Sequence, residues 1–227
     1  MQDIRLHYIE KGTGFPLILL HGNGEEHGYF EYQIEYFSKE YRVIAIDTRG
    51  HGKTPRGEAP FTIRQFAEDL KCFLDEMGIE KAHILGFSDG GNIAMIFAMR
   101  YPQYVNKLIL NGANLNGSGV KFSVQFPIIL GYKIASLFAA KKPDAKKNAE
   151  MLGLMVNDPN VPTAELAKIK VPTLVVAGTK DMIREDHTRL IAEKIPGAKL
   201  ALIPGDHFVA AKNSNTFNQT VEAFLRK

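Results

Sequence analysis

Gly86-Phe87-Ser88-Asp89-Gly90 is the stretch that decides the fold, because of the segments on either side of it. The apolar run 82–85 precedes it like a buried strand, and 91–100 follows it like an apolar helix that Pro102 ends. A serine between glycines at a strand-to-helix turn is typical of the strained turn that exposes a nucleophile. Five residues alone recur by chance, but in this setting they predict a nucleophile at Ser88.

Two further residues stand where this serine would need a base and an orienting acid. A serine hydroxyl becomes nucleophilic only when a base takes its proton, and that base must itself be held in place. Asp181 follows the apolar strand 171–177, and His207 follows the strand 199–203. Because open parallel sheets carry their sites at the carboxyl ends of strands, these positions predict a triad of Ser88, Asp181 and His207.

Other carboxylates fit the orienting role less well. Asp206 is adjacent to His207 in sequence and would point away from it. Residues 112–116 follow the strand expected at 107–110, and they contain no carboxylate. Glu185 and Asp186 open a predicted helix, where negative charge is favoured by the helix dipole. Asp181 is therefore the preferred orienting residue.

The rest of the chain alternates short apolar strands with amphipathic helices, which predicts an α/β protein with a mostly parallel sheet covered by helices. The expected strands are 17–20, 43–46, 82–85, 107–110, 173–177 and 199–203, and the expected helices are 62–77, 90–100, 184–195 and 213–226. The N-terminal segments 2–9 and 16–21 are expected to begin the sheet as antiparallel strands.

One segment, 115–168, interrupts this alternation because it contains no strand. Its apolar helical part includes Phe122, Phe126 and Phe138, and the charged stretch Lys141–Lys147 follows. We expect a small cap over the site, with these three phenylalanines lining the substrate pocket, because long insertions near strand ends usually line sites. The alternative is a helical excursion that only packs on the core. The lysines are read as a solvated face.

These motifs together resemble the α/β-hydrolase superfamily along nearly the whole chain. The agreeing pieces are His21-Gly22-Asn23-Gly24, residues 47–54, residues 86–90, the Gly178-x-x-Asp181 turn and His207. The resemblance implies an α/β-hydrolase fold with a mostly parallel eight-stranded sheet, a core of 1–114 and 169–227, and a helical cap of 115–168. Residues 86–91, 101–102 and 111–114 are similar to the valacyclovir hydrolase (biphenyl hydrolase-like) branch.

The resemblance also implies the remaining parts of a serine hydrolase site. The oxyanion would be held by the backbone N–H groups of Asn23 and Asp89. The expected activity is cleavage of a small or medium carboxylic ester through an acyl-enzyme. Thioesters, lactones, amides and carbon–carbon cleavage of a diketone stay open, as does a ligand sensor of this fold with little turnover.

Asp89 allows two readings. In the resembled branch, the aspartate after the nucleophile is understood to hold the amino group of an amino-acid ester, so Asp89 is a candidate substrate-binding residue. It also opens a helix, where a negative charge contributes about 0.3–1 kcal/mol whatever the substrate.

Composition sets limits on partners and cofactors. The chain has 227 residues, of which 45% are hydrophobic and 23% charged, as in an ordinary globular domain. A net charge of +3 does not indicate nucleic-acid binding. The single cysteine, Cys72, and the lack of an apolar signal core indicate a cytoplasmic protein. No membrane partner is expected, because the apolar part of 115–168 is too short for a membrane span and is broken by Pro127, Gly131 and Lys133. No cofactor or metal is expected, because the metal and phosphate-loop motifs are missing. The oligomeric state is left open.

Overall fold

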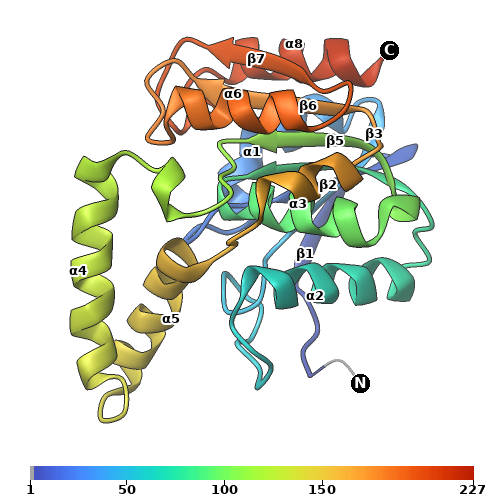
Figure 1. The fold of residues 1–227 in the computed structure, drawn as a ribbon. Helices are drawn as coiled ribbons and strands as arrows, with labels where there is room; N and C mark the ends of the chain where they lie inside the picture. The colour runs from blue at the N-terminus through green and yellow to red at the C-terminus, as the bar shows by residue number, and fades with distance from the viewer. Residues whose placement is uncertain (1–2) are drawn as a thin grey trace.

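The computed structural model describes residues 3–227 and contains one mostly parallel sheet between two layers of helices (Figure 1). The seven strands are β1 (Tyr8–Lys11), β2 (Phe15–Leu20), β3 (Tyr41–Ile46), β4 (Ala82–Phe87), β5 (Val105–Asn111), β6 (Thr173–Gly178) and β7 (Lys199–Ile203). Their order across the sheet is β1-β3-β2-β4-β5-β6-β7. Only β1 runs antiparallel to its neighbour.

Four of the α-helices match the four predicted ranges to within one residue at each end. The α-helices are α1 (Glu31–Phe37), α2 (Ile63–Glu76), α3 (Asp89–Arg100), α4 (Phe122–Phe138), α5 (Pro143–Asn157), α6 (Glu185–Lys194), α7 (Val209–Lys212) and α8 (Ser214–Leu225). The short 3-10 segments are η1 (His27–Phe30), η2 (Pro102–Tyr104), η3 (Gly117–Gly119) and η4 (Thr163–Lys168). No helix within residues 3–227 is both long and apolar enough to cross a membrane.

Alternating side chains of the strands build a separate core on each face of the sheet. In β2, Ile18 and Leu20 join the cluster under α2, α3 and α6, whereas Leu17 and Leu19 join the cluster under α1 and α8. These four side chains are essentially inaccessible to solvent. Because both faces are covered, the strands read as continuous apolar runs, which is why the sequence located them.

The predicted α/β-hydrolase fold is confirmed, with two corrections at the N-terminal edge. The segment 16–21 was expected to be antiparallel, but β2 pairs in parallel with both β3 and β4. The helical connection through α1 returns the chain to the same end of the sheet, and this connection produces a parallel pair. The strand expected at 2–9 is β1, which begins only at Tyr8 and ends at Lys11. The described sheet has seven strands, against the eight that the resemblance implied. Gln2 lies outside the described residues.

The segment between β5 and β6 contains η3, α4, α5 and η4. Helices α4 and α5 pack on each other as a hairpin that projects from the sheet (Figure 1). Pro127 lies inside α4 without ending it. At this position proline removes one hydrogen bond to the first turn, and the rest of the helix continues. The division into a core of 1–114 and 169–227 and a cap of 115–168 stays a prediction.

Candidate active site

Ser88 lies on a strained turn between β4 and α3. Its backbone has φ 53° and ψ −119°, a conformation that L-residues rarely adopt. A Cβ on Gly86 would lie 2.1 Å from the Gly90 carbonyl oxygen, and one on Gly90 would lie 2.0 Å from the Leu20 carbonyl oxygen. Both positions therefore require glycine. The Ser88 N–H donates to the Asn111 carbonyl at 2.8 Å, which joins this turn to the end of β5.

Asp181 and His207 come together from the loops after β6 and β7. His207 Nδ1 lies 2.7 Å from Asp181 Oδ1, and both side chains are buried. The same carboxylate accepts the Ile183 N–H at 2.9 Å and the Gly178 N–H at 3.4 Å. Because an ionised carboxylate can only accept, His207 Nδ1 carries the hydrogen and Nε2 remains available as a base.

His207 faces the serine turn from the side of β5. A Cβ on Gly112 would lie 2.7 Å from His207 Cε1, so this glycine makes room for the imidazole. The Phe87 ring, next to Ser88, is 4.8 Å from the His207 ring, measured between centroids. His207 Nε2 is buried and has no hydrogen-bond partner. The Ser88–His207 hydrogen bond is thus not formed here, and such bonds often tighten only when substrate binds.

The turn after β2 lies against the serine. A Cβ on Gly22 would lie 3.1 Å from Ser88 Cβ, which brings Asn23 close to the nucleophile. The Asn23 side chain donates to the Met151 carbonyl of α5 at 2.7 Å, so this turn is also joined to the α4–α5 hairpin. Asp89 is the first residue of α3, and its N–H therefore has no acceptor within the helix. The role of the Asn23 and Asp89 N–H groups as oxyanion donors stays a prediction.

The Asp89 carboxylate is buried and only partly hydrogen-bonded. Its Oδ1 accepts from Asn92 Nδ2 at 3.3 Å, whereas its Oδ2 has no partner. Burial raises the pKa of Asp89 to about 6, and the negative charge of Asp158 acts in the same direction. The side-chain amides of Asn92 and Asn23 offset only part of this rise in pKa. Asp89 is next to the nucleophile in sequence, and few hydrogen bonds stabilise the negative charge of its ionised carboxylate. A cation in this position would compensate it.

The three phenylalanines expected to line the pocket lie on α4. Phe122, Phe126 and Phe138 expose 77%, 54% and 48% of their surface. Phe122 borders a cavity of about 680 Å³ beside η3, and Phe138 borders one of about 480 Å³ between α4 and α5. Neither cavity is lined by Ser88, Asp181 or His207. The structure does not bring these rings together with the triad, and their role in substrate binding stays a prediction.

Aromatic residues beside the histidine were not found from the sequence. The Tyr29 ring stacks on Phe87 with a centroid distance of 4.3 Å, and Phe208 lies 5.6 Å from His207. Burial raises the pKa of Tyr29, whose hydroxyl is buried without a hydrogen-bond partner. Tyr29 belongs to η1, which no periodic pattern or motif marks. Phe208 could have been inferred from its position directly after His207.

Within residues 3–227, one group of side chains has the spacing of metal ligands. The candidate ligand atoms of His7, His27 and Asp47 lie within 4.8 Å of one another. Each histidine Nδ1 lies 2.8 Å from one oxygen of Asp47, and the N–H groups of His27 and Lys53 donate to the same carboxylate. These contacts pair both carboxylate oxygens, so hydrogen bonding alone accounts for the arrangement.

Comparisons with known proteins identify the family. A family model described as the alpha/beta hydrolase fold matches residues 16–133. RutD of Azorhizobium caulinodans is 30% identical over 252 residues, covering 98% of this chain and 95% of RutD. Human serine hydrolase BPHL is 29% identical over 252 residues, covering 100% of this chain and 84% of BPHL. A solved hydrolase from Pseudomonas aeruginosa PA01 has a TM-score of 0.81 at 25% identity, covering 98% of this chain and 94% of that structure.

The chain therefore belongs to the α/β-hydrolase family and is a hydrolase of that superfamily. The similarity to human BPHL confirms the resemblance that the sequence around Ser88 indicated.

Proposed function

We propose that this protein is a serine hydrolase that cleaves a small or medium carboxylic ester through an acyl-enzyme. The observation that carries this proposal is the buried His207–Asp181 pair, which leaves Nε2 unpartnered on the side of the strained Ser88 turn. Human BPHL, named a serine hydrolase, aligns along the whole chain. RutD, provisionally named a carbamate hydrolase, aligns along nearly all of it, so carbamates belong in any substrate panel.

The reaction would proceed in two stages. Ser88 Oγ attacks the acyl carbon while its proton moves to His207 Nε2, and Asp181 stabilises the resulting imidazolium. The bond to the alcohol breaks as His207 returns the proton to the leaving oxygen. Water then attacks the acyl-enzyme while His207 takes a proton from it. The bond to Ser88 Oγ breaks as His207 returns that proton to Oγ, and the acid is released. The N–H groups of Asn23 and Asp89 would hold the oxyanion, and loss of one such donor typically slows an enzyme by about 10²–10³-fold.

An active-site label tests the nucleophile directly. An alkyl fluorophosphonate should add one adduct, at Ser88, and abolish hydrolysis of chromogenic esters. Ser88→Ala should lose both labelling and hydrolysis, whereas Ser123→Ala, at an exposed serine of α4, should keep both. Labelling of another serine would contradict the assignment. A burst of product without steady turnover would indicate a ligand sensor instead.

Amino-acid esters form the second candidate substrate class, because of the unpartnered Oδ2 of Asp89. An ammonium group held there would compensate a buried carboxylate within reach of the acyl site. The test is a matched pair of esters, one of an L-amino acid and one of its des-amino analogue, on wild type and Asp89→Asn. If Asp89 holds the amine, wild type prefers the amino ester and the variant loses only that preference. Equal rates for both esters on wild type would leave Asp89 as a helix-opening charge.

A further inference from the structure

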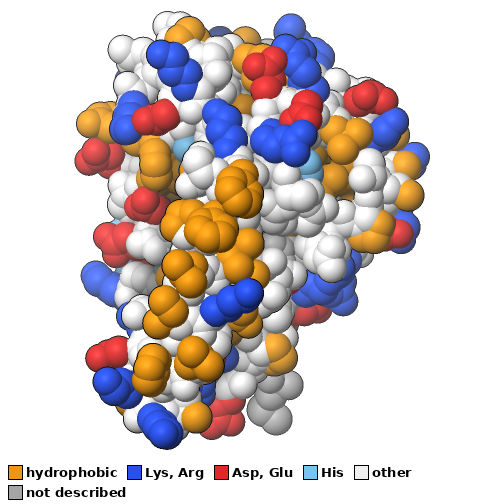
Figure 2. Space-filling view, turned by 60° about the vertical axis from the view of Figure 1, so that its left-hand side comes forward, with side chains coloured by type: hydrophobic (Ala, Val, Ile, Leu, Met, Phe, Trp, Pro, Cys, Tyr) orange, Lys and Arg blue, Asp and Glu red, His pale blue; other side chains and the backbone are white. Residues whose placement is uncertain are grey.

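Helix α4 presents a continuous apolar face to solvent. Residues spaced by about four positions lie on one side of a helix, and the large apolar residues of α4 follow this spacing. The members of this α4 face expose 48–77% of their surface: Phe122, Phe126, Leu130, Ile134, Leu137 and Phe138. Figure 2 shows them as a hydrophobic band along the hairpin.

Nothing in the described chain covers this face. Among the residues of α4, only Gln125 is buried, and the helix packs mainly on α5. Single exposed apolar residues are ordinary, but a contiguous band of six large ones marks an interaction surface. The α4 face therefore needs an occupant from outside the described chain.

The charges around the α4 face decide which occupant fits. Residues 115–149 contain six lysines and one acidic residue, Asp144, although the whole chain has a net charge of only +3. Lys133 is an exposed residue within α4, and Lys121, Lys141 and Lys142 flank the helix. None of these four lysines forms an ion pair within residues 3–227. A second copy docked through α4 would bring two such sets of unpaired positive charge together, so charge complementarity favours an anionic surface.

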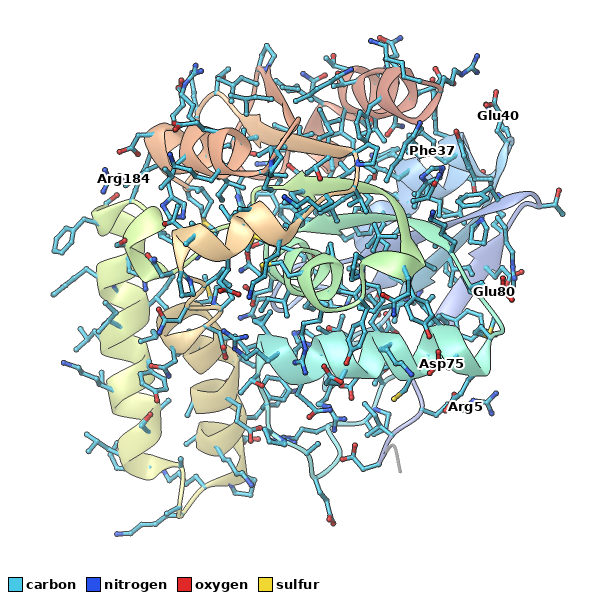
Figure 3. All side chains as sticks on the ribbon, turned by 45° about the vertical axis from the view of Figure 1, so that its right-hand side comes forward. Arg5, Phe37, Glu40, Asp75, Glu80 and Arg184 are labelled. Carbon is cyan, nitrogen blue, oxygen red and sulfur yellow. The ribbon has the colours of Figure 1, made fainter. Side chains whose placement is uncertain are left out.

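A further basic residue lies next to the beginning of α4. Figure 3 shows Arg184 beside the beginning of α4, where it lines a cavity with Lys121 and Phe122. Arg184 pairs with Asp186, so the unpaired positive charge next to the α4 face comes from the four lysines.

We infer that the α4 face docks the protein on a membrane surface rich in anionic lipids. A helix of this length is about 25 Å long and can lie flat in the lipid interface with its apolar side chains below the headgroups. Lys133 would extend its ammonium group toward the phosphates while its methylene chain stays among the apolar side chains. This differs from the sequence prediction of no membrane partner, which considered only a spanning segment.

Vesicle sedimentation tests this inference. The Ser88→Ala protein, which should not hydrolyse the lipid, is mixed with phosphatidylcholine vesicles with or without phosphatidylglycerol. We expect binding to the phosphatidylglycerol vesicles that weakens as salt is added. Leu130→Ser/Leu137→Ser should bind at least about tenfold more weakly, because two inserted side chains are lost. Lys133→Glu should also bind about tenfold more weakly.

Matched variants on other faces serve as controls. Tyr32→Ser removes an exposed aromatic residue from α1, and Lys81→Glu makes the same charge change at an exposed lysine before β4. Both should bind vesicles like the parent protein. Thermal melting of every variant checks its folding. Each substitution is also made in the protein that retains Ser88, and hydrolysis of a water-soluble ester by that protein checks its active site. Docking does not depend on the reaction, so loss of one does not imply loss of the other.

Several results would overturn the inference. Absence of binding to phosphatidylglycerol vesicles would do so, as would equal binding of the parent and the double serine variant. Equal binding to both kinds of vesicle would remove the role of anionic lipid. A dimer in sedimentation velocity that Leu130→Ser/Leu137→Ser dissociates, with no vesicle binding, would assign the α4 face to a second copy.

Discussion

The sheet and the α4–α5 hairpin use apolar residues in opposite ways. From Leu17 onward in β2 and throughout β4 the apolar side chains are buried, and groups proposed for catalysis follow the ends of these strands. In α4, a sequence of similar apolar content leaves its largest side chains in solvent. The difference shows that apolar content specifies burial only where the fold supplies a partner surface. Helices cover both faces of the sheet, whereas nothing in residues 3–227 covers the α4 face.

The two regions also hold their charges differently. In the core, Arg49 is fully buried and forms two hydrogen bonds to Asp69, at 2.7 Å each, while Asp3 binds it from the other side. At the hairpin, Arg56 and Glu150 pair across a partly exposed surface, 2.8 Å apart. Removal of a charge should therefore cost far more in the core than at the hairpin.

The largest expected effect is at the buried His207–Asp181 pair. Asp181→Asn keeps the shape but donates a hydrogen to Nδ1, which forces the hydrogen of His207 onto Nε2. We expect kcat on an ester substrate to fall by about 10⁴-fold with little change in folding. Asp206→Asn, beside the same histidine but exposed and paired with Lys212, is the control and should retain near-normal kcat. A large fall in kcat for Asp206→Asn with near-normal kcat for Asp181→Asn would assign the orienting role to Asp206 instead.

The next effect is on core stability. Arg49→Ala leaves the Asp69 carboxylate buried without its main partner, and we expect a loss of about 3–5 kcal/mol in the free energy of unfolding. Arg42→Ala breaks a similarly bidentate pair with Glu10, but this pair is partly exposed, so its loss should be no more than about 1 kcal/mol. Urea denaturation measures both. Equal losses would show that burial does not distinguish these pairs.

Asp89 should make stability depend on pH. Its pKa in the folded protein is about 6, against 3.8 for an ordinary aspartate, so the folded state holds this proton more tightly than the unfolded state. The contribution of Asp89 to the free energy of unfolding is fully present below about pH 4 and is lost as the pH rises to 6, a decrease of about 3 kcal/mol. Asp89→Asn should therefore be more stable than wild type by about that amount at pH 8, with the gain diminishing toward pH 4.

Urea denaturation at both pH values checks the Asp89 prediction. Asp144→Asn, at an exposed carboxylate of α5, is the control and should show no such pH-dependent gain. An equal gain for Asp89→Asn at pH 4 and pH 8 would mean that ionisation of the carboxylate is not its cause.

The smallest effect is expected at the hairpin. Glu150→Gln removes the charge that faces Arg56, and because both partners are partly exposed, the loss should be at most about 1 kcal/mol and smaller at high salt. Thermal unfolding at low and high salt measures it. A loss as large as that of Arg49→Ala would contradict the contrast between the two regions.

The sequence predicted most of the sheet because strands covered on both faces read as unbroken apolar runs, as 82–85 and 173–177 do. It also predicted the pairing of His207 with Asp181, since both follow strands that end at the same edge. It did not predict the direction of β2, because an apolar run carries no information on which strand becomes its neighbour. The spacing of Phe122 and Phe126 indicated one helical face, but not whether that face is covered. The unpartnered oxygen of Asp89 depends on distances that only the folded chain sets.

The Asn23–Met151 contact has a consequence for variation in the hairpin. The acceptor is the backbone carbonyl of Met151, 128 positions along the chain from Asn23. Replacing the Met151 side chain therefore leaves the acceptor in place. Inserting one residue earlier in α5 turns that carbonyl by about 100° around the helix axis and moves it away from Asn23. The turn beside Ser88 is thus tolerant of sequence change in α5 and sensitive to a change in its length.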